Sequence, residues 1–408
     1  MSGTVGLDRD VASVVDSGSC SGCGTCCLID TGLEMGLDES GYLRPTRVRP
    51  PETAASATRA QVREFRATCP GRTVVSPHPV GAPRDPIVGS YLAAWAAWAT
   101  DPQFRHRGSS GGVLSALSAW LIEQGEVARV VGAAASPADP SRTVTVAITS
   151  RSEALLSAGS RYAPVGNAAS PHALASDSAF LGKPCEASAV RALSGQRGTG
   201  PGYVLSFFCA GTPSQLATDS LVHHIGVGPG ERLTDLWYRG RGWPGSFTAV
   251  APSGTYAASY DDSWGKHLGP TMQWRCKICP DGVGESSDIT AADFWKVDER
   301  GYPVFTESQG RSALLARTPK GHQAVLRAIS AGVIEVEPMD VRDLVRTQPF
   351  QRTRRTTLAG RLIGSLVGGR RIPRYRGFGL IRLALSAPRR TVRSARGTRR
   401  RVRAGTKR

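Results

Sequence analysis

The chain has 408 residues, 40% of them hydrophobic, so it is long enough for two or three domains with a sizeable core. No apolar run reaches about 18 residues, which excludes a membrane-spanning helix, and no signal peptide is evident, so we expect a cytoplasmic protein. The net charge is +18, but residues 351–408 alone carry 18 Arg, one Lys and no acidic residue. Since +18 minus +19 is −1, residues 1–350 are nearly neutral.

The first cysteine set begins in a Cys-Ser-Gly-Cys-Gly-Thr-Cys-Cys run, at Cys20, Cys23, Cys26 and Cys27. Three thiolates with two residues between successive members bind one face of a cubane cluster, and a remote Cys followed by Pro, here Cys69, supplies the fourth ligand in ferredoxin patterns. Gly22 and Gly24 let the backbone curl closely and offer N–H groups to the cluster sulfides. Cys27 is the expected spare.

A proline-rich stretch, residues 71–90, predicts an extended linker between a small N-terminal iron–sulfur module, residues 1–70, and a larger domain, residues 91–345. Alternating helix and strand patterns follow. Apolar residues at helical spacing predict a helix over 113–124, and Gly125 suits its end. Strands are predicted over 127–135, 143–149, 203–208, 233–238 and within 288–295, and a further helix over 213–225.

A Gly- and Ser-rich turn opens the first of these helices, at Ser109, Ser110, Gly111 and Gly112. Such a turn exposes backbone N–H groups at the positive end of the helix dipole, which suits the pyrophosphate of a dinucleotide such as FAD. A plain helix cap is the alternative. The Rossmann G-x-G-x-x-G pattern is lacking, so an ordinary NAD fold is not predicted.

A second turn, at residues 159–162, places a cation and an aromatic ring side by side after Ser160. Arg161 could hold a phosphate through two parallel hydrogen bonds, and Tyr162 could stack on a ring system. The alternative is a surface loop. Asp293, near the end of the last predicted strand, could be a structural hydrogen-bond acceptor or a site residue.

The second cysteine set is dispersed along the chain, at Cys185, Cys209, Cys276 and Cys279. Dispersed ligands meet only in a folded domain, so this cluster would be built into the core. Zinc sites use similar cysteine pairs and remain an alternative for both sets. Structural disulfides are disfavoured because a cytosolic chain keeps its thiols reduced.

The basic tail, residues 346–408, has apolar patches at 358–367 and 377–385 between its arginines. It could lie on an anionic membrane surface, bind nucleic acid through phosphates, or stay disordered. We treat it as an appendage outside the chemistry.

The motifs, in their order, resemble the coenzyme F420 hydrogenase/dehydrogenase beta-subunit family over roughly residues 15–340. The matching pieces are Cys-Ser-Gly-Cys-Gly-Thr-Cys at 20–26, Ser-Gly-Gly-Val at 110–113, Gly-Ser-Arg-Tyr at 159–162, Gly-Lys-Pro-Cys-Glu at 182–186, Phe-Cys-Ala-Gly-Thr-Pro-Ser at 208–214, Arg-Cys-Lys-Ile-Cys-Pro-Asp at 275–281, Ala-Asp-Phe-Trp at 292–295 and Ala-Arg-Thr-Pro-Lys-Gly at 316–321. The ordered combination is far more specific than any one piece.

The resemblance implies an α/β (α+β) flavoprotein core that binds FAD and one or two [4Fe–4S] clusters and exchanges a hydride with coenzyme F420. By matching motifs, the second cysteine set would bind the cluster nearest the flavin, and the Ser-Gly turn, with Ser109, would meet the FAD phosphates. Ser160, Arg161, Tyr162 and Lys183 would line the flavin pocket. Lys183, beside the ring, would favour the anionic reduced flavin, and Arg161 is the second expected catalytic side chain.

The sequence therefore predicts an FAD- and iron–sulfur-dependent oxidoreductase with a ferredoxin-like N-terminal module and a disordered or amphipathic tail. Electrons would pass between coenzyme F420 or ferredoxin and another acceptor, with a partner subunit to be expected. The alternatives are a ferredoxin-fed reductase of another organic substrate and a cluster-containing nucleic-acid-binding protein. The last is disfavoured because the positive charge is confined to the tail.

Overall fold

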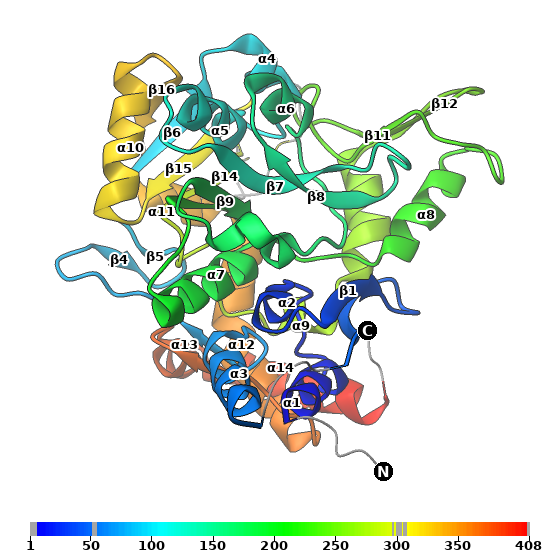
Figure 1. The fold of residues 1–408 in the computed structure, drawn as a ribbon, viewed down its shortest axis with the longest axis vertical. Coiled ribbons are helices and arrows are strands. Elements are labelled where there is room, and N and C mark those ends of the chain that lie inside the picture. Colours follow the sequence, from blue (N-terminus) through cyan, green and yellow to red (C-terminus); the bar gives the residue numbers. More distant parts are fainter. Residues whose placement is uncertain (1–5, 51–54, 296–297, 299–303, 305–307, 406–408) are drawn as a thin grey trace.

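A mixed eight-stranded sheet forms the centre of the computed structural model, which describes residues 6–50, 55–295, 298, 304 and 308–405 (Figure 1). The strand order is β16-β6-β15-β14-β10-β9-β7-β8. The inner strands β7, β9, β10 and β14 run parallel, and every other pairing is antiparallel. The bounds are β6 Ala93–Ala99, β7 Arg129–Ala135, β8 Thr143–Ile148, β9 Ser178–Gly182, β10 Tyr203–Phe207, β14 Ile289–Asp293, β15 Ser312–Ala316 and β16 Ile334–Pro338.

Helices cover both faces of this sheet. Val130 and Val131 of β7 belong to two different hydrophobic clusters, because successive side chains of a strand point to opposite faces. The cluster around Val130 includes α5 (Val113–Glu123) and α10 (Pro319–Ser330). The cluster around Val131 includes α7 (Pro184–Arg197) and the N-terminal helices. An α/β core is therefore confirmed.

Most predicted elements are confirmed to within two residues. The helix predicted over 113–124 is α5, and the strands over 127–135, 143–149, 203–208 and 288–295 contain β7, β8, β10 and β14. The helix over 213–225 is α8 (Gln215–His224), and the strand over 233–238 contains β11 (Asp235–Trp237), which pairs with β12 (Phe247–Ala251) and β13 (Gly254–Ala258) in a separate sheet. The shorter helices are α4 (Pro102–Arg107), α6 (Arg151–Leu156) and α9 (Trp274–Lys277).

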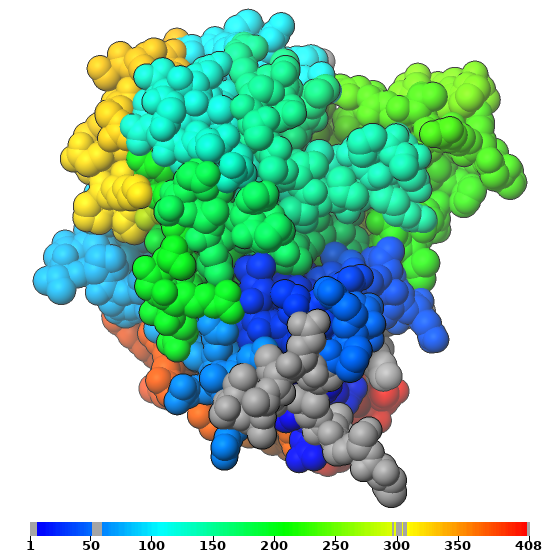
Figure 2. Space-filling view, in the orientation of Figure 1, coloured from blue at the N-terminus to red at the C-terminus, as the bar shows by residue number. Residues whose placement is uncertain are grey.

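The N-terminal segment packs directly on the core. It consists of α1 (Gly6–Asp16), α2 (Thr25–Ile29), a β1 (Leu33–Leu37) to β2 (Leu43–Arg47) hairpin and α3 (Ala55–Thr68). Leu7 of α1 and Phe65 of α3 share one hydrophobic cluster with Val190 and Leu193 of α7. Figure 2 shows the blue N-terminal segment pressed against the green body. The ferredoxin-like character and the domain boundary stay predictions, but the segment shares its apolar core with the sheet.

The proline-rich stretch is also part of the packed structure. It contains β3 (Thr73–Val75), β4 (Arg84–Asp85) and β5 (Gly89–Ser90). Val88 is buried, and Ser76 donates a hydrogen bond to the buried carboxylate of Glu285. The proline-rich stretch is therefore packed against the fold and does not form a freely extended linker.

The disordered alternative for the basic tail is wrong, whereas its amphipathic alternative stays a prediction. Residues 341–403 form α11 (Val341–Thr347), α12 (Pro349–Val367), β17 (Arg374–Arg376), α13 (Leu380–Ser386) and α14 (Pro388–Arg403). Strand β17 pairs in parallel with β3, so the C-terminal segment and the proline-rich stretch meet in one small sheet. In Figure 1 the orange and red C-terminal helices lie at the same end of the molecule as α1 and α3. A high arginine content does not predict a solvated segment here, because Arg354 and Arg355 are buried and have hydrogen-bond partners inside the fold.

No helix in the described part of the chain is long and apolar enough to cross a bilayer.

Candidate functional site

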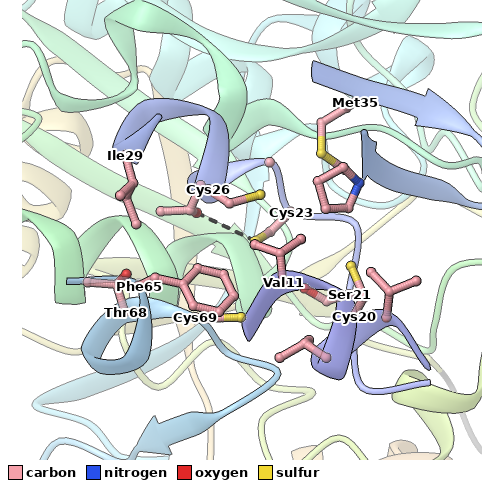
Figure 3. A pocket seen from close by; sticks show the side chains of 15 residues that line it. Val11, Cys20, Ser21, Cys23, Cys26, Ile29, Met35, Phe65, Thr68 and Cys69 are labelled. Carbon is pink, nitrogen blue, oxygen red and sulfur yellow. Dashed lines mark hydrogen bonds between the residues drawn. The ribbon is translucent and has the colours of Figure 1, made fainter. Parts of the chain in front are cut away.

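The first cysteine set converges on one pocket between α1, α2 and α3. Cys20, Cys23, Cys26 and Cys69 all line it (Figure 3), whereas Cys27 lines a different hollow beside β1. Apolar side chains such as Val11 surround the thiols. The tertiary structure thus brings the distant Cys69 to the three clustered cysteines and directs Cys27 away.

Two glycines shape the loop that carries these cysteines. Gly22 has φ +70° and Gly24 has φ +90°, conformations that favour glycine. A Cβ on Gly24 would lie 2.7 Å from the Cβ of Ala169, so a side chain there would collide with the neighbouring segment. The sequence prediction that these glycines let the backbone curl agrees with this geometry.

The thiols of the first set influence one another. Burial raises the pKa of Cys69, and the neighbouring Cys23 and Cys20 raise it further. The pKa of Cys26 is raised by its hydrogen bond with Cys27, then by burial and by the other thiols. Four mutually repelling buried thiolates need positive charge between them, which a cluster of four irons supplies.

The second cysteine set also converges. Burial raises the pKa of Cys209 to about 12, with Cys276 and Cys279 contributing. Burial also raises the pKa of Cys185 well above its usual value, and Cys279 and Cys209 add to the effect. The backbone N–H of Thr212 donates to the Cys276 sulfur over 3.3 Å. Residues from three distant parts of the sequence therefore form one group of thiols.

All nine cysteines are free thiols, so the structure forms no disulfide. Within the described residues, no three Cys, His, Asp or Glu side chains lie close enough to hold one metal ion. Ligands of a single zinc crowd together because Zn–S bonds are about 2.3 Å long, whereas the ligands of a cubane bind different irons and stand farther apart. The donor chemistry of both sets, four thiols each, fits [4Fe–4S] clusters.

A cavity of about 430 Å³ opens beside the second set. It lies within the size range of small-molecule and cofactor sites. Cys209 forms part of its wall, so the cavity and the thiols share a boundary. Seven of the eight residues predicted to bind cofactor line it: Ser109, Ser110, Gly112, Ser160, Arg161, Tyr162 and Lys183.

Gly111 is the one predicted cofactor-binding residue that does not line the cavity. Its backbone groups instead form hydrogen bonds that hold the turn in place. Its N–H donates to the Ser312 hydroxyl over 2.9 Å, and its carbonyl accepts a hydrogen bond from Ala99 over 2.7 Å. The next residue, Gly112, has φ +73°, and a Cβ there would lie 2.2 Å from the carbonyl oxygen of Phe104. The turn therefore needs glycine for close backbone approach, and it points the N-terminus of α5 into the cavity.

Lys183 lies between the cavity and the second set. It is buried, and its ammonium donates to the Val165 carbonyl and, over 2.7 Å, to Glu186. Burial lowers the pKa of Lys183, but Glu186 outweighs that effect, and Cys185 and Cys209 add to it, so the net pKa is raised. The ammonium stays charged, and these two hydrogen bonds use two of its three N–H donors.

Arg161 lines the cavity, but its guanidinium forms its hydrogen bonds with other protein atoms. It donates to Leu236 and Pro140 carbonyls at 2.7 and 2.8 Å, and to Thr143 and the Arg142 carbonyl at 3.0 and 2.9 Å. Four of its five donors are thus occupied. We expect Arg161 to brace the pocket wall, and its predicted catalytic role has no support in this arrangement.

Arg239 is the cavity residue that sequence reasoning missed. Its side chain is fully buried, donates to Asp293 over 2.6 Å, and also donates to the carbonyl of Ser109. The rings of Trp243, Tyr260 and Trp295 lie about 5 Å from its guanidinium carbon. The residue stands in a Gly-rich loop without periodic pattern, so no local signal marked it. Asp293 is therefore the ion-pair partner of a cavity cation.

The comparisons with known proteins fall on the same residues. Residues 94–170 match the family model for the N-terminal part of the coenzyme F420 hydrogenase/dehydrogenase beta subunit, and residues 176–342 match its C-terminal part. The chain belongs to this family. The matched regions hold most of the cavity wall and the whole second cysteine set. They leave out the first set and residues 343–408, of which residues 347–351 also line the cavity.

Two relatives agree with this assignment. A coenzyme F420 hydrogenase subunit beta from Methanococcus voltae is 26% identical over 265 residues, which is 62% of this chain and 86% of that protein. A chain of the xenon-derivatised F420-reducing [NiFe] hydrogenase complex from Methanosarcina barkeri superimposes with a TM-score of 0.51 at 20% identity, covering 67% of this chain and 91% of that one. The second likeness concerns the fold.

Proposed function

We propose that this protein is an iron–sulfur flavoprotein oxidoreductase that passes electrons between coenzyme F420 and two [4Fe–4S] clusters by way of FAD. The carrying observation is the shared wall, since Cys209 lines the cofactor-sized cavity and also belongs to the second set of four thiols. Family membership supports the same chemistry. Bound FAD would supply the conversion between a two-electron hydride and single electrons.

The residues of the cavity have separate tasks in this proposal. The N-terminus of α5 and the turn at Gly112 bind the phosphates through backbone N–H groups. Lys183 supplies a fixed positive charge beside the second set, because Glu186 holds its ammonium in place. Phe207 and Phe208 contribute apolar wall next to Cys209 and exclude water there.

The test begins with anaerobically purified protein, in which iron and released flavin are quantified. We expect one flavin and about eight irons per chain, as two cubanes require. Reduced coenzyme F420 is then added, and flavin bleaching is followed optically while cluster reduction is followed by electron paramagnetic resonance. The wild type should show both signals. Cys185→Ser should keep the flavin bleaching and lose the signal of one cluster. Zinc without flavin would refute the proposal.

The ferredoxin-fed alternative predicts a different donor. If reduced ferredoxin bleaches the flavin and reduced coenzyme F420 does not, the chain reduces some other organic substrate. The same spectrophotometric experiment therefore separates the two candidates.

The exposed side chains of the C-terminal helices suggest a membrane as a further partner. Six large apolar side chains of α12, α13 and α14 are exposed among arginines: Ile363, Leu366, Val367, Ile381, Leu385 and Val392. We propose that these helices contact an anionic bilayer through such side chains, because apolar insertion and cationic attraction then add.

Vesicle flotation tests this contact. We expect binding to vesicles that contain phosphatidylserine, weaker binding to neutral vesicles, and loss of binding in Ile381→Glu with Leu385→Glu. Salt-sensitive binding to DNA or RNA that survives the double substitution would instead favour the nucleic-acid alternative.

A further inference from the structure

One buried arginine connects the two cysteine sets. Arg275 directly precedes Cys276 in α9, and this residue is only 2% exposed to solvent. Its Nη2 donates a hydrogen bond of 3.0 Å to the carbonyl oxygen of Pro70, the neighbour of Cys69. A single side chain thus reaches from the backbone of the second set to the backbone of the first.

The guanidinium of Arg275 has donors to spare. Its Nε and Nη1 are buried and find no hydrogen-bond partner among the residues that the structure describes. Leaving buried charged donors unsatisfied is costly, and such groups call for an explanation. The ring of Tyr375 lies 5.6 Å from its guanidinium carbon, but a ring offers no second hydrogen-bond acceptor of matching strength.

Of the other buried arginines, Arg317 and Arg354 donate to backbone carbonyl oxygens, and two more have carboxylate partners. Arg239 is paired with Asp293 and Arg355 with Glu285. Arg275 forms no ion pair with a carboxylate in the part of the chain that the structure describes. Burial lowers the pKa of Arg275, whereas Tyr375 first, and then Cys279, Cys185 and Cys276, raise it, which places three thiols of the second set within electrostatic reach of the guanidinium. On the first set, Arg275 lowers the pKa of Cys69, which again places its charge within electrostatic reach of that thiol.

We propose that Arg275 is the shared counter-cation of the two clusters, with its free N–H groups directed at cluster and thiolate sulfurs, and that it raises the reduction potentials of both. The proposal rests on the proposed function, since it needs both clusters. Each cluster gains one electron on reduction, and no bond in the protein forms or breaks. Because the reduced cluster is more negative, a buried cation stabilises it more than the oxidised cluster, and hydrogen bonds to sulfur act in the same direction.

Because Arg275 lies between the two sets, it can stabilise both reduced clusters at once, which a cation beside a single cluster cannot do. When both clusters are reduced, their negative charges repel each other. A guanidinium between the sets attracts both charges and offsets this repulsion, so the second electron enters more easily. Arg275 therefore couples the potential of the first set, which lies outside the family match, to that of the set at the flavin cavity.

The test compares three arginine substitutions. Arg275→Met should lower both potentials, whereas Arg44→Met should lower only that of the first cluster and Arg354→Met only that of the second. Arg44 acts on Cys20, and Arg354 acts on Cys209. The measurement is a reductive titration followed by electron paramagnetic resonance. For Arg275→Met we expect at least a tenfold change in each reduction equilibrium constant, or about 59 mV for one electron.

Single-cluster backgrounds assign the signals. Cys185→Ser retains the first cluster and Cys69→Ser retains the second, so each potential is read without overlap. Arg275→Lys keeps the charge and loses the planar donors, so its shift should be smaller than that of Arg275→Gln. If the Met variant does not fold, the comparison of the Lys and Gln variants tests the proposal in its place.

A shift in only one potential, or in neither, while the variants keep wild-type iron content and circular dichroism, would overturn the role of Arg275 and leave the proposed function standing. Absence of iron from the wild type would overturn the proposed function, and the inference with it. The two failures are therefore distinguishable.

Discussion

The guanidinium of Arg354 donates a hydrogen bond of 2.7 Å to the backbone carbonyl oxygen of Cys209. Arg354 belongs to α12, beyond the family match, and Cys209 belongs to the wall between the cavity and the second set. Gln351 of the same helix donates to the same carbonyl over 3.1 Å. The C-terminal helices thus support the site that the family-typical core builds.

The close contact between α12 and α14 is the first feature to test. A Cβ on Gly364 would lie 2.3 Å from the carbonyl oxygen of Ala395, so Gly364→Ala should push the helices apart and cost about 1–3 kcal/mol of stability. Gly397 of α14 meets nothing nearer than 4.0 Å, so Gly397→Ala should stabilise by about 0.5–1 kcal/mol. Thermal unfolding of the two variants gives the comparison. A destabilisation of equal size in both would mean that the helices do not pack this way.

Glu285 makes stability depend on acid pH. This buried carboxylate pairs with Arg355 of α12 and lies 3.2 Å from Arg84. Burial raises the pKa of Glu285, but the charge of Arg355 and the hydrogen bonds outweigh it, so the net pKa is lowered. Its stabilisation is therefore present above the unfolded-state pKa of about 4.3 and is lost as the pH falls through the lower folded-state value.

Glu285→Gln leaves Arg355 buried without its charged partner and should cost about 3–5 kcal/mol at neutral pH. The difference between wild type and variant should shrink as the pH falls below about 4. The matched control is Arg342→Gln, which breaks an exposed pair with Asp340 and should leave the unfolding midpoint unchanged. A wild type–variant difference that is constant between pH 3 and 7 would contradict the ionised state of Glu285.

Cysteine substitutions decide which thiols hold the first cluster. Cys69 lines the pocket of Cys20, Cys23 and Cys26, and Cys27 does not. Cys69→Ser should therefore remove roughly half of about eight irons, as loss of one of two cubanes requires, and Cys27→Ser should leave the iron content unchanged. Iron assays after anaerobic reconstitution measure both. If the effects of the two substitutions were reversed, Cys27 would be the ligand.

Gly112 tests the turn at the mouth of the cavity. Gly112 and Gly125 flank α5 with similar φ, +73° and +67°, so both Ala variants carry the same backbone strain. Only at position 112 does the new Cβ meet a backbone atom, the Phe104 carbonyl oxygen at 2.2 Å. Gly112→Ala should therefore bind FAD at least tenfold more weakly, about 1.4 kcal/mol, whereas Gly125→Ala keeps wild-type affinity. Equal flavin affinities would show that the turn is not at the cofactor.

Much of the core could be read from local pattern. Helix α5 and strands β7 and β10 combine clear periodicity with glycine or proline at their ends, and their predicted bounds agree with the structure. Arg239 could not be found in this way, because its role depends on rings and a carboxylate that arrive from distant segments. Charge content alone does not reveal that the basic C-terminal segment is folded, because it predicts solvation only when the charges have no partners in the fold.

Local patterns identify the spacing of Cys20, Cys23 and Cys26 and the glycine turn, because ligand spacing and backbone conformation act over a few residues, and the order of the motifs identifies the family. Folding of the whole chain brings the dispersed second set together, turns Cys69 and not Cys27 toward the first pocket, and places Cys209 at the border of the cavity. It also placed Arg275 between the sets and folded the arginine-rich helices onto the core. These relationships join residues up to hundreds of positions apart, and packing of the whole chain, not any local preference, brings them together.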